Sequence, residues 1–437
     1  MWETLKSLIL RIFGVKLPQT DRQYEQQSKW ASVYENVSEI NLTAMISGKL
    51  ATLTTTDAVI AVEGDNKRTE ALQNILNENV LNRARKIVSA ALGTGGVVLV
   101  PYSADGKQIL VDMVPQNCFF ITEKIGNTVT KACILADYII RDNKKYMRWT
   151  DYALESGACV IRNRATVENS PCALGTLTEW KNIPEEIHVP GSERLLFGYM
   201  KCPTDNRRPD ETQGVPITYG CDKLIALCLE TLEEEANEYR IKRGFLGVDS
   251  TLFGKDDKLP KSGLFKTFES GTADEDLWKE YSPEIRHAAY SARVQELFAL
   301  LEKAIGVSKG ILTTPDPVAT ATEVIYNQHD TWALVGEIRK NLAAALNDLS
   351  YALNVLCNYY GISPAGDYSI KYDWDMSLLE DTSTTWQQMK DGYSMGLFGR
   401  AELRSWQTGE TLEQAQKAVD EIAEKEPKLQ DLIGNAE

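Results

Sequence analysis

Residues 282–361 read SPEIRHAAYSARVQELFALLEKAIGVSKGILTTPDPVATATEVIYNQHDTWALVGEIRKNLAAALNDLSYALNVLCNYYG, and this stretch decides the fold. Its opening Ser-Pro-Glu and the apolar residues that follow at spacings of three and four predict an amphipathic helix that ends at Gly306. The loop 307–319 contains two prolines and a glycine. A capping box, Thr320-x-x-Glu323, then predicts the start of a second helix, which continues to Gly361.

The second helix is unusually long for a globular protein. At 1.5 Å per residue its length is about 60 Å, which exceeds the core of one small domain. We therefore expect an elongated subunit that spans an assembly. Its apolar stripe consists of Trp332, Val335, Ile338, Leu342, Leu346, Leu349, Leu353 and Leu356.

The composition is that of a globular protein, with 437 residues, 43% hydrophobic and 25% charged. No window of eighteen apolar residues exists, so we expect no membrane contact through a spanning helix. Residues 1–16 (MWETLKSLILRIFGVK) are predicted to form an amphipathic helix that docks on its own or a neighbouring subunit. A signal peptide is disfavoured because Glu3 precedes the apolar run and Arg11 interrupts it.

The net charge of −15 argues against a sequence-specific DNA-binding protein, which presents a basic face. It is compatible with a protein that lets DNA pass, because like charge avoids adhesive phosphate contacts. Eight cysteines without a C-x-x-C pair predict reduced thiols. The three histidines form no H-x-x-x-H pair, which gives a zinc site little support.

The order of predicted elements is that of an α+β protein. Residues 20–90 read as helices, including one from Lys67 to Ala91, and short strands from 97 to 149 follow as an antiparallel meander. Residues 200–216 are polar and form the clearest boundary. A third strong helix at 218–243 precedes a small insertion, 244–283, with a strand at 264–269.

Beyond Gly361 we expect a strand at 368–374 and, from 382 to 425, a cluster of short helices broken at Gly396 and Gly409.

The helix at 218–243 carries a cluster of acids. A solvated helix face is the plainer interpretation, and an acidic wall of a channel is the more specific one. The cluster consists of Glu230, Glu233, Glu234, Glu235 and Glu238.

Two glycine-containing segments resemble nucleotide-binding motifs, but their spacing or their position in the chain does not fit. Gly93-Thr-Gly95-Gly96 follows a predicted helix and precedes a strand, which is the reverse of a dinucleotide-binding fingerprint. The segment from Gly247 to Lys255 has the wrong glycine spacing for a phosphate loop. We therefore expect no cofactor and no catalytic activity.

A metal site of a nuclease is a further possibility, because several carboxylates lie close together in the sequence. A solvated strand edge is favoured, since no histidine or lysine helper is near. The carboxylates are Asp373, Asp375, Glu380 and Asp381.

Four stretches stand in a characteristic order along the chain: KSGLFKTFESGTADEDLWKEYSPEIR (261–286), PDPVATATEVIYNQHDTWALVGEIRKNL (315–342), YDWDMSLLED (372–381) and MGLFGRAELR (395–404). Through them the chain resembles, over roughly 215–425, the portal proteins of tailed bacteriophages, of the type found in siphophages of Gram-positive hosts.

The resemblance implies a homo-oligomeric ring, usually of twelve subunits, at one capsid vertex of the virion. A packaging motor drives double-stranded DNA through such a ring, and DNA leaves by the same conduit. The implied parts are a wing (1–215), a stem helix (216–243), a clip (244–283), a second stem helix (284–306), a tunnel loop (307–319), a wing with the long helix (320–376) and a helical crown (377–437).

The resemblance also implies partners and contact residues. Lys309, Thr313 and Thr314 of the tunnel loop become candidates for weak phosphate contact. The large terminase ATPase and the head–tail adaptor would dock on the clip, and the major capsid and scaffolding proteins would surround the ring, assembled in the host cytoplasm. The candidate docking residues of the clip are Lys255, Lys258, Lys261, Asp274, Glu275 and Asp276.

Two alternatives remain open. Another head or connector structural protein would also be acidic and helical, and a metal-dependent nuclease would use the carboxylates at 373–381.

Overall fold

The computed structural model describes residues 20–425 except for short gaps at 38–39, 57, 104–105, 127, 169, 208–212, 242–244, 250–264, 269–277, 282–283, 315–320, 375–388 and 409. The predicted N-terminal amphipathic helix therefore lies outside the described residues. The chain divides into two compact units. The first comprises Met1–Asp316 and Gln328–Trp374, and the second comprises Pro317–Asn327 and Asp375–Glu437. The fold is mixed α and β, as predicted.

The first unit begins with α2 (Thr20–Glu35) and α3 (Leu42–Thr55), followed by α4 (Lys67–Asn79) and α5 (Ala84–Thr94). Asparagine side chains accept hydrogen bonds from backbone N–H groups at two of these N-termini: Asn41 caps α3 and Asn66 caps α4.

The prediction of one helix from Lys67 to Ala91 is wrong. The backbone leaves the helical region at Val80, and a short 3₁₀ turn, η1 (Leu81–Arg83), separates α4 from α5. Asn79, the last residue of α4, lies at this break, and its side-chain oxygen accepts a hydrogen bond from the Val111 N–H group at 3.3 Å. Tertiary structure thus overrides a continuous helical pattern.

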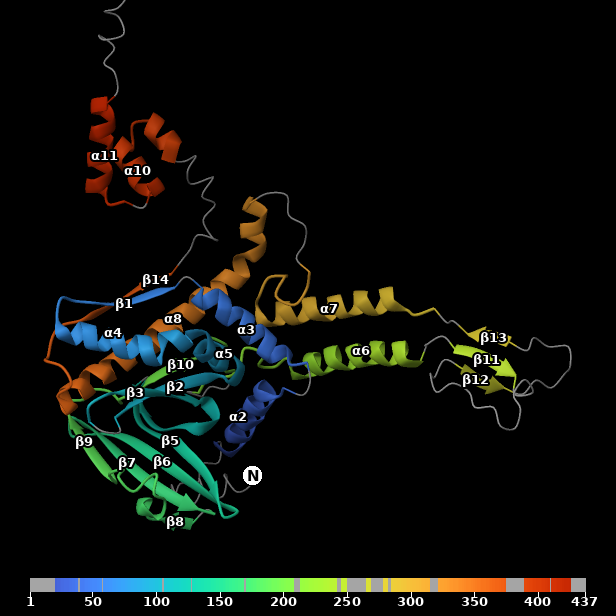
Figure 1. Ribbon diagram of the computed structural model, residues 1–437, viewed down its shortest axis with the longest axis horizontal. Helices are drawn as coiled ribbons and strands as arrows, with labels where there is room; N and C mark the ends of the chain where they lie inside the picture. The colour runs from blue at the N-terminus through green and yellow to red at the C-terminus, as the bar shows by residue number, and fades with distance from the viewer. Residues whose placement is uncertain are drawn as a thin grey trace, which may run out of the picture. The chain divides into compact units, whose positions relative to one another are not determined.

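Two antiparallel sheets follow (Figure 1). The first has the order β10-β2-β3, formed by β2 (Gly96–Tyr102), β3 (Leu110–Pro115) and β10 (Gly198–Lys201). The second is a meander of β4 (Phe119–Ile125), β5 (Thr128–Arg141), β6 (Lys144–Glu155), β7 (Ala158–Val167) and β8 (Ser170–Cys172), with β9 (Glu186–Pro190) paired to β7. The predicted strands are confirmed, but they belong to two sheets rather than one meander, and the second sheet continues beyond residue 149.

The long helix is α8 (Ala321–Tyr360), which has 40 residues and ends at Gly361, a glycine in the left-handed region. All eight residues of its predicted apolar stripe are buried. It lies against β10, where a Cβ on Gly198 would collide with the carbonyl oxygen of Ala345. The register of helix and strand therefore requires glycine at this position.

The N-terminal region and the end of the first unit pair directly with each other. Strand β1 (Val59–Glu63) is antiparallel to β14 (Ser369–Asp373), which confirms the predicted strand near 368–374. Beside this pair, Arg68 of α4 is fully buried and donates to the carbonyl oxygens of Asn354, Ser363 and Pro364 and to the Asn358 side chain. The Arg68 guanidinium therefore joins α4 to the C-terminal end of α8 and to the residues that follow it.

A small sheet connects α6 (Asp222–Ile241) to α7 (His287–Ile305). Its order is β12-β11-β13, with β11 (Phe245–Asp249) parallel to β12 (Phe265–Phe268) and antiparallel to β13 (Trp278–Tyr281). The predicted strand at 264–269 is confirmed, whereas the flanking strands were not predicted. The predicted helix start at Ser282-Pro283 is wrong, because α7 begins at His287.

The described part of the second unit contains the short helices α10 (Arg400–Thr408) and α11 (Leu412–Lys425). Gly396 adopts a positive φ of 75° before α10, which agrees with the predicted break. The Glu402 carboxylate accepts a hydrogen bond from the Gly399 N–H group at 2.7 Å and thereby caps α10.

Candidate functional site: the helix pair and the loop after it

The sequence places its candidate contact residues on α6, on the small sheet and on the loop that follows α7. Helices α6 and α7 lie side by side and run in opposite directions (Figure 1). Their contact is shallow, since only Val294, Leu297, Leu301 and Glu302 of α7 are buried. Apolar residues on both helices remain exposed, with exposed fractions of 39% for Leu227 and 51% for Leu300.

A bidentate ion pair joins the two helices next to the small sheet. Glu238 of α6 is 6% exposed and accepts hydrogen bonds from the Arg286 side chain at 3.1 Å (Nε) and 2.6 Å (Nη2). The Arg286 backbone N–H group also donates to this carboxylate, at 3.1 Å. The hydrogen bonds that Arg286 donates to the Glu238 carboxylate raise the pKa of the Arg286 guanidinium. This pair fixes where the chain enters α7.

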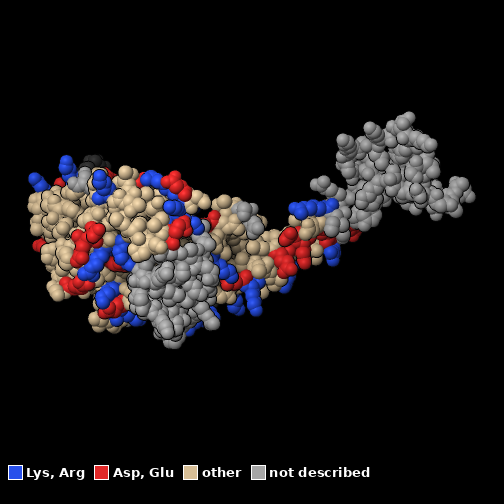
Figure 2. Space-filling view, turned by 90° about the horizontal axis from the view of Figure 1, so that it is seen from below, with Lys and Arg blue, Asp and Glu red and all other residues tan. Residues whose placement is uncertain are grey.

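The five glutamates predicted as an acidic wall do not share one environment. Glu238 neutralises Arg286 within the chain, and Glu235 is half-buried with its carboxylate 3.4 Å from Nδ1 of His287. The other three, Glu230, Glu233 and Glu234, are exposed and are named here the α6 acidic face. Acidic side chains gather along this helix pair in Figure 2. Whether the α6 acidic face lines a channel stays a prediction.

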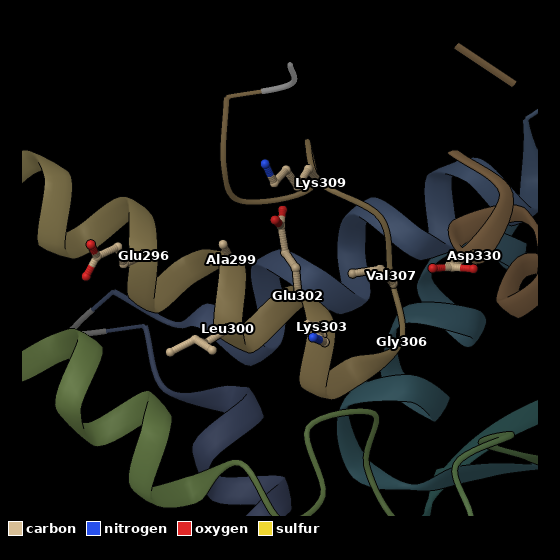
Figure 3. Close-up of a pocket in the computed structure, with 9 residues that line it drawn as sticks. All are labelled: Glu296, Ala299, Leu300, Glu302, Lys303, Gly306, Val307, Lys309 and Asp330. Atoms are coloured by element: carbon tan, nitrogen blue, oxygen red, sulfur yellow. The ribbon is translucent and has the colours of Figure 1, made fainter. Parts of the chain in front are cut away.

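The loop after α7 is built around one buried carboxylate that the sequence analysis missed. Glu302, in the last turn of α7, is only 1% exposed. Its side chain accepts hydrogen bonds from the backbone N–H groups of Gly310 (3.2 Å), Leu312 (2.6 Å) and Thr313 (3.1 Å). The Thr313 hydroxyl donates a fourth, at 2.7 Å. Figure 3 shows the Glu302 side chain directed at the loop.

The backbone of Glu302 contributes to the same turn. Gly306 has a positive φ of 84°, and the Val307 N–H group donates to the Glu302 carbonyl oxygen at 3.0 Å, while Gly306 N–H donates to the Lys303 carbonyl oxygen at 3.3 Å. This is a Schellman arrangement. One available sequence signal was an acid in the last turn of a helix, where the helix dipole disfavours it.

A second tether holds the loop to α8. The Ser308 N–H group donates to the Thr331 hydroxyl at 2.9 Å, and the Thr331 N–H group donates to the Ser308 hydroxyl at 3.4 Å. Thr314 N–H also donates to the Gln295 side chain of α7, at 3.4 Å. The described loop, 307–314, is therefore bonded to both helices that flank it.

The three predicted phosphate-contact residues differ accordingly. Lys309 and Thr314 are exposed, whereas Thr313 is 9% exposed and its hydroxyl is bonded to Glu302. In this structure Thr313 anchors the loop. The role of Lys309 and Thr314 towards DNA stays a prediction.

An open hollow lies beside the loop. Lysine and acidic side chains both surround it, so its lining favours neither anions nor cations. The lining residues are Glu296, Ala299, Leu300, Glu302, Lys303, Gly306, Val307, Lys309 and Asp330, shown in Figure 3.

The remaining predicted sites fall partly outside the described residues. This applies to all six clip residues, Lys255, Lys258, Lys261, Asp274, Glu275 and Asp276, and to Asp375, Glu380 and Asp381. Asp373 lies at the end of β14, opposite Val59 of β1. Within the described ranges, no group of three or more His, Cys, Asp or Glu residues is arranged to hold a metal ion.

The glycine and cysteine motifs have structural explanations. Gly95 ends α5 with a positive φ of 105° and lies so close to Gly214 that neither position accommodates a side chain. All eight cysteines are free in the structure. Among the helices that the structure describes, none is long and apolar enough to cross a membrane.

No protein-family model matches the chain, and no curated protein matches it. Among solved structures, it is similar to a chain from the neck of an empty GTA particle computed with C6 symmetry, with a TM-score of 0.36, 11% identity, and coverage of 82% of this chain and 88% of that chain. A chain from the neck of the native GTA particle computed with C12 symmetry gives a TM-score of 0.33 with the same identity and coverage. Similarities this weak establish no common fold, so the function has to be argued from the chain's own residues.

Proposed function

We propose that the protein is a bacteriophage portal protein, which forms a ring that conducts double-stranded DNA into and out of the capsid. The observation that carries the proposal is the succession of α6, a small three-stranded sheet, the returning helix α7, an anchored loop and a 40-residue helix. The portal resemblance in the sequence predicts this order of stem, clip, stem, tunnel loop and long wing helix.

The surface of the helix pair supports assembly into a ring. Leu227 and Tyr239 of α6 and Leu300 of α7 leave large apolar side chains 39%, 42% and 51% exposed. A two-helix hairpin that buries so little of its own apolar surface needs a neighbour to cover it. In a closed ring, a head-to-tail contact repeats around the axis and covers every such surface.

The charge of the helix pair suits a conduit that must not retain DNA. The α6 acidic face repels phosphates, and the exposed Lys309 offers at most a single screened attraction. A protein that holds DNA tightly would need the opposite balance.

The first experiment determines the assembly state. We expect the purified chain to form closed rings, seen as class averages with rotational symmetry and a central opening. Leu227→Glu on α6 is expected to shift the population towards monomers without loss of helical content. Ile125→Glu, at an exposed apolar position of β4 outside the helix pair, serves as control. A chain that is monomeric at all concentrations and salt conditions would refute the proposal.

Other head or connector proteins also form rings, so a second experiment separates them from a portal. Proheads assembled with and without this chain are supplied with terminase, ATP and DNA. A portal is required for filling; a connector added after packaging is not.

The third candidate, a metal-dependent nuclease, is tested by nicking of supercoiled plasmid in Mg²⁺ or Mn²⁺. Nicking that is lost in Asp373→Asn would favour the nuclease instead.

A further inference from the structure

We propose that Glu302 is a positioning residue that locks the 308–314 loop onto α7 and makes this loop a fixed element rather than a flexible connection. The inference concerns the single chain and does not depend on the proposed function. It rests on the four hydrogen bonds that the Glu302 carboxylate accepts from the loop.

The argument starts from the cost of burying a charge. An ionised carboxylate is stable in a protein interior only when hydrogen-bond donors or an opposite charge replace its lost water. Glu302 is 1% exposed, and at the C-terminal end of α7 the helix dipole opposes its charge. Four hydrogen bonds to this carboxylate come from the loop. The loop therefore supplies what makes the buried charge tolerable.

The dependence is mutual. A loop with three backbone N–H groups turned inwards must find acceptors for them, because an unpaired buried N–H group is costly. One carboxylate satisfies all three, at Gly310, Leu312 and Thr313. Neither the loop conformation nor the buried charge is stable without the other, so the two form one cooperative unit.

The geometry fixes where Lys309 lies. Ser308 is tied to Thr331 of α8, and Gly310 is tied to Glu302 of α7, so the backbone on both sides of Lys309 is held. The Lys309 side chain itself is exposed. If the proposed function is correct, Lys309 is presented to the conduit at a constant place relative to α7 and α8.

The test uses Lys309 as a built-in reporter, because trypsin cleaves after an accessible lysine only where the backbone can unfold locally. We expect slow cleavage between Lys309 and Gly310 in the wild type. Glu302→Gln keeps the side-chain size but offers one acceptor oxygen in place of two. It is expected to accelerate this cleavage, and the hydrogen–deuterium exchange of residues 308–314, about tenfold or more.

Two further variants sharpen the test. Glu296→Gln alters an exposed acid on the same helix and should leave cleavage and exchange at wild-type rates. Thr313→Val removes only the hydroxyl donor and should give a smaller acceleration than Glu302→Gln, which covers the case that Glu302→Gln folds poorly. Wild-type rates in both Glu302→Gln and Thr313→Val would overturn the lock, as would rapid cleavage after Lys309 in the wild type. Since no DNA or ring is involved, such a failure would leave the portal proposal intact.

Discussion

Replacing Arg68 with methionine should strongly destabilise the first unit. The guanidinium is fully buried between α4 and the end of α8. It donates to the carbonyl oxygens of Pro364 (3.0 Å), Asn354 (2.9 Å) and Ser363 (2.7 Å), and to the Asn358 side chain. Methionine retains the length of the aliphatic stem but offers none of these donors.

The magnitude follows from the contacts. Hydrogen bonds to a charged group contribute about 1.5–3 kcal/mol each, and the four together outweigh the desolvation of the guanidinium, which costs several kcal/mol. Removal leaves buried carbonyl oxygens without donors. A buried acceptor that loses its donor costs about 1–3 kcal/mol. Several acceptors lose the same donor here, so we expect Arg68→Met to cost about 3–5 kcal/mol in total.

The measurement is urea unfolding followed by circular dichroism at one fixed protein concentration, since assembly shifts apparent stability. With a slope of about 3 kcal/mol per M, the midpoint should fall by roughly 1 M or more. Arg85→Met, at an exposed position of α5, is the matched control and should shift it little. Equal midpoints for the Arg68 and Arg85 variants would refute the reasoning.

Gly198→Ala should force β10 away from α8, because the new Cβ would collide with the Ala345 carbonyl oxygen. We expect a lower melting temperature and slower refolding than in the wild type, and an unchanged melting temperature would contradict this prediction. Burial raises the pKa of the Cys202 thiol to about 11 from 9.0, so the folded protein binds protons more tightly than the unfolded chain, and the free energy of unfolding should fall as the pH rises from about 9 to about 11. Cys202→Ala should make the pH profile shallower over that interval, and an identical slope would refute the assignment. Replacing the three glutamates of the α6 acidic face with lysines should increase non-specific retention of DNA at low salt, and the effect should disappear at high salt. Unchanged retention at low salt would favour the interpretation that these residues form a solvated helix face.

The sequence alone predicts those elements whose pattern is long and repeated. The apolar stripe of α8 repeats at spacings of three and four from Trp332 to Leu356, which is typical of a helix. All eight of its residues are buried. The strands β11 and β13 were not predicted, although β12, which is just as short, was. The parallel partner of β11 is β12, some twenty residues further along the chain. Local sequence carries little information about such pairing.

In the candidate site, too, the sequence predicts exposed residues but not the contacts between distant ones. Lys309 and Thr314 could be selected from the loop sequence as exposed, whereas Thr313 could not be distinguished from Thr314, since their difference depends on Glu302. The sequence does not distinguish Glu238 from the neighbouring acids, because its partner Arg286 lies 48 positions further along the chain. Buried charges are defined by partners that the fold brings from elsewhere, and no local pattern encodes them.

The pairing of β1 with β14 has a consequence for how the protein is made. Residues 59–63 emerge from the ribosome early and have to wait for residues 369–373 before their strand acquires a partner. The Arg68 guanidinium likewise has no access to the carbonyl oxygens of Ser363 and Pro364 until those residues have been synthesised. Closure of this loop of about 300 residues is entropically slow. A nascent chain released too soon would therefore lack both the partner strand and the acceptors, so only polypeptides synthesised past residue 373 can complete the first unit.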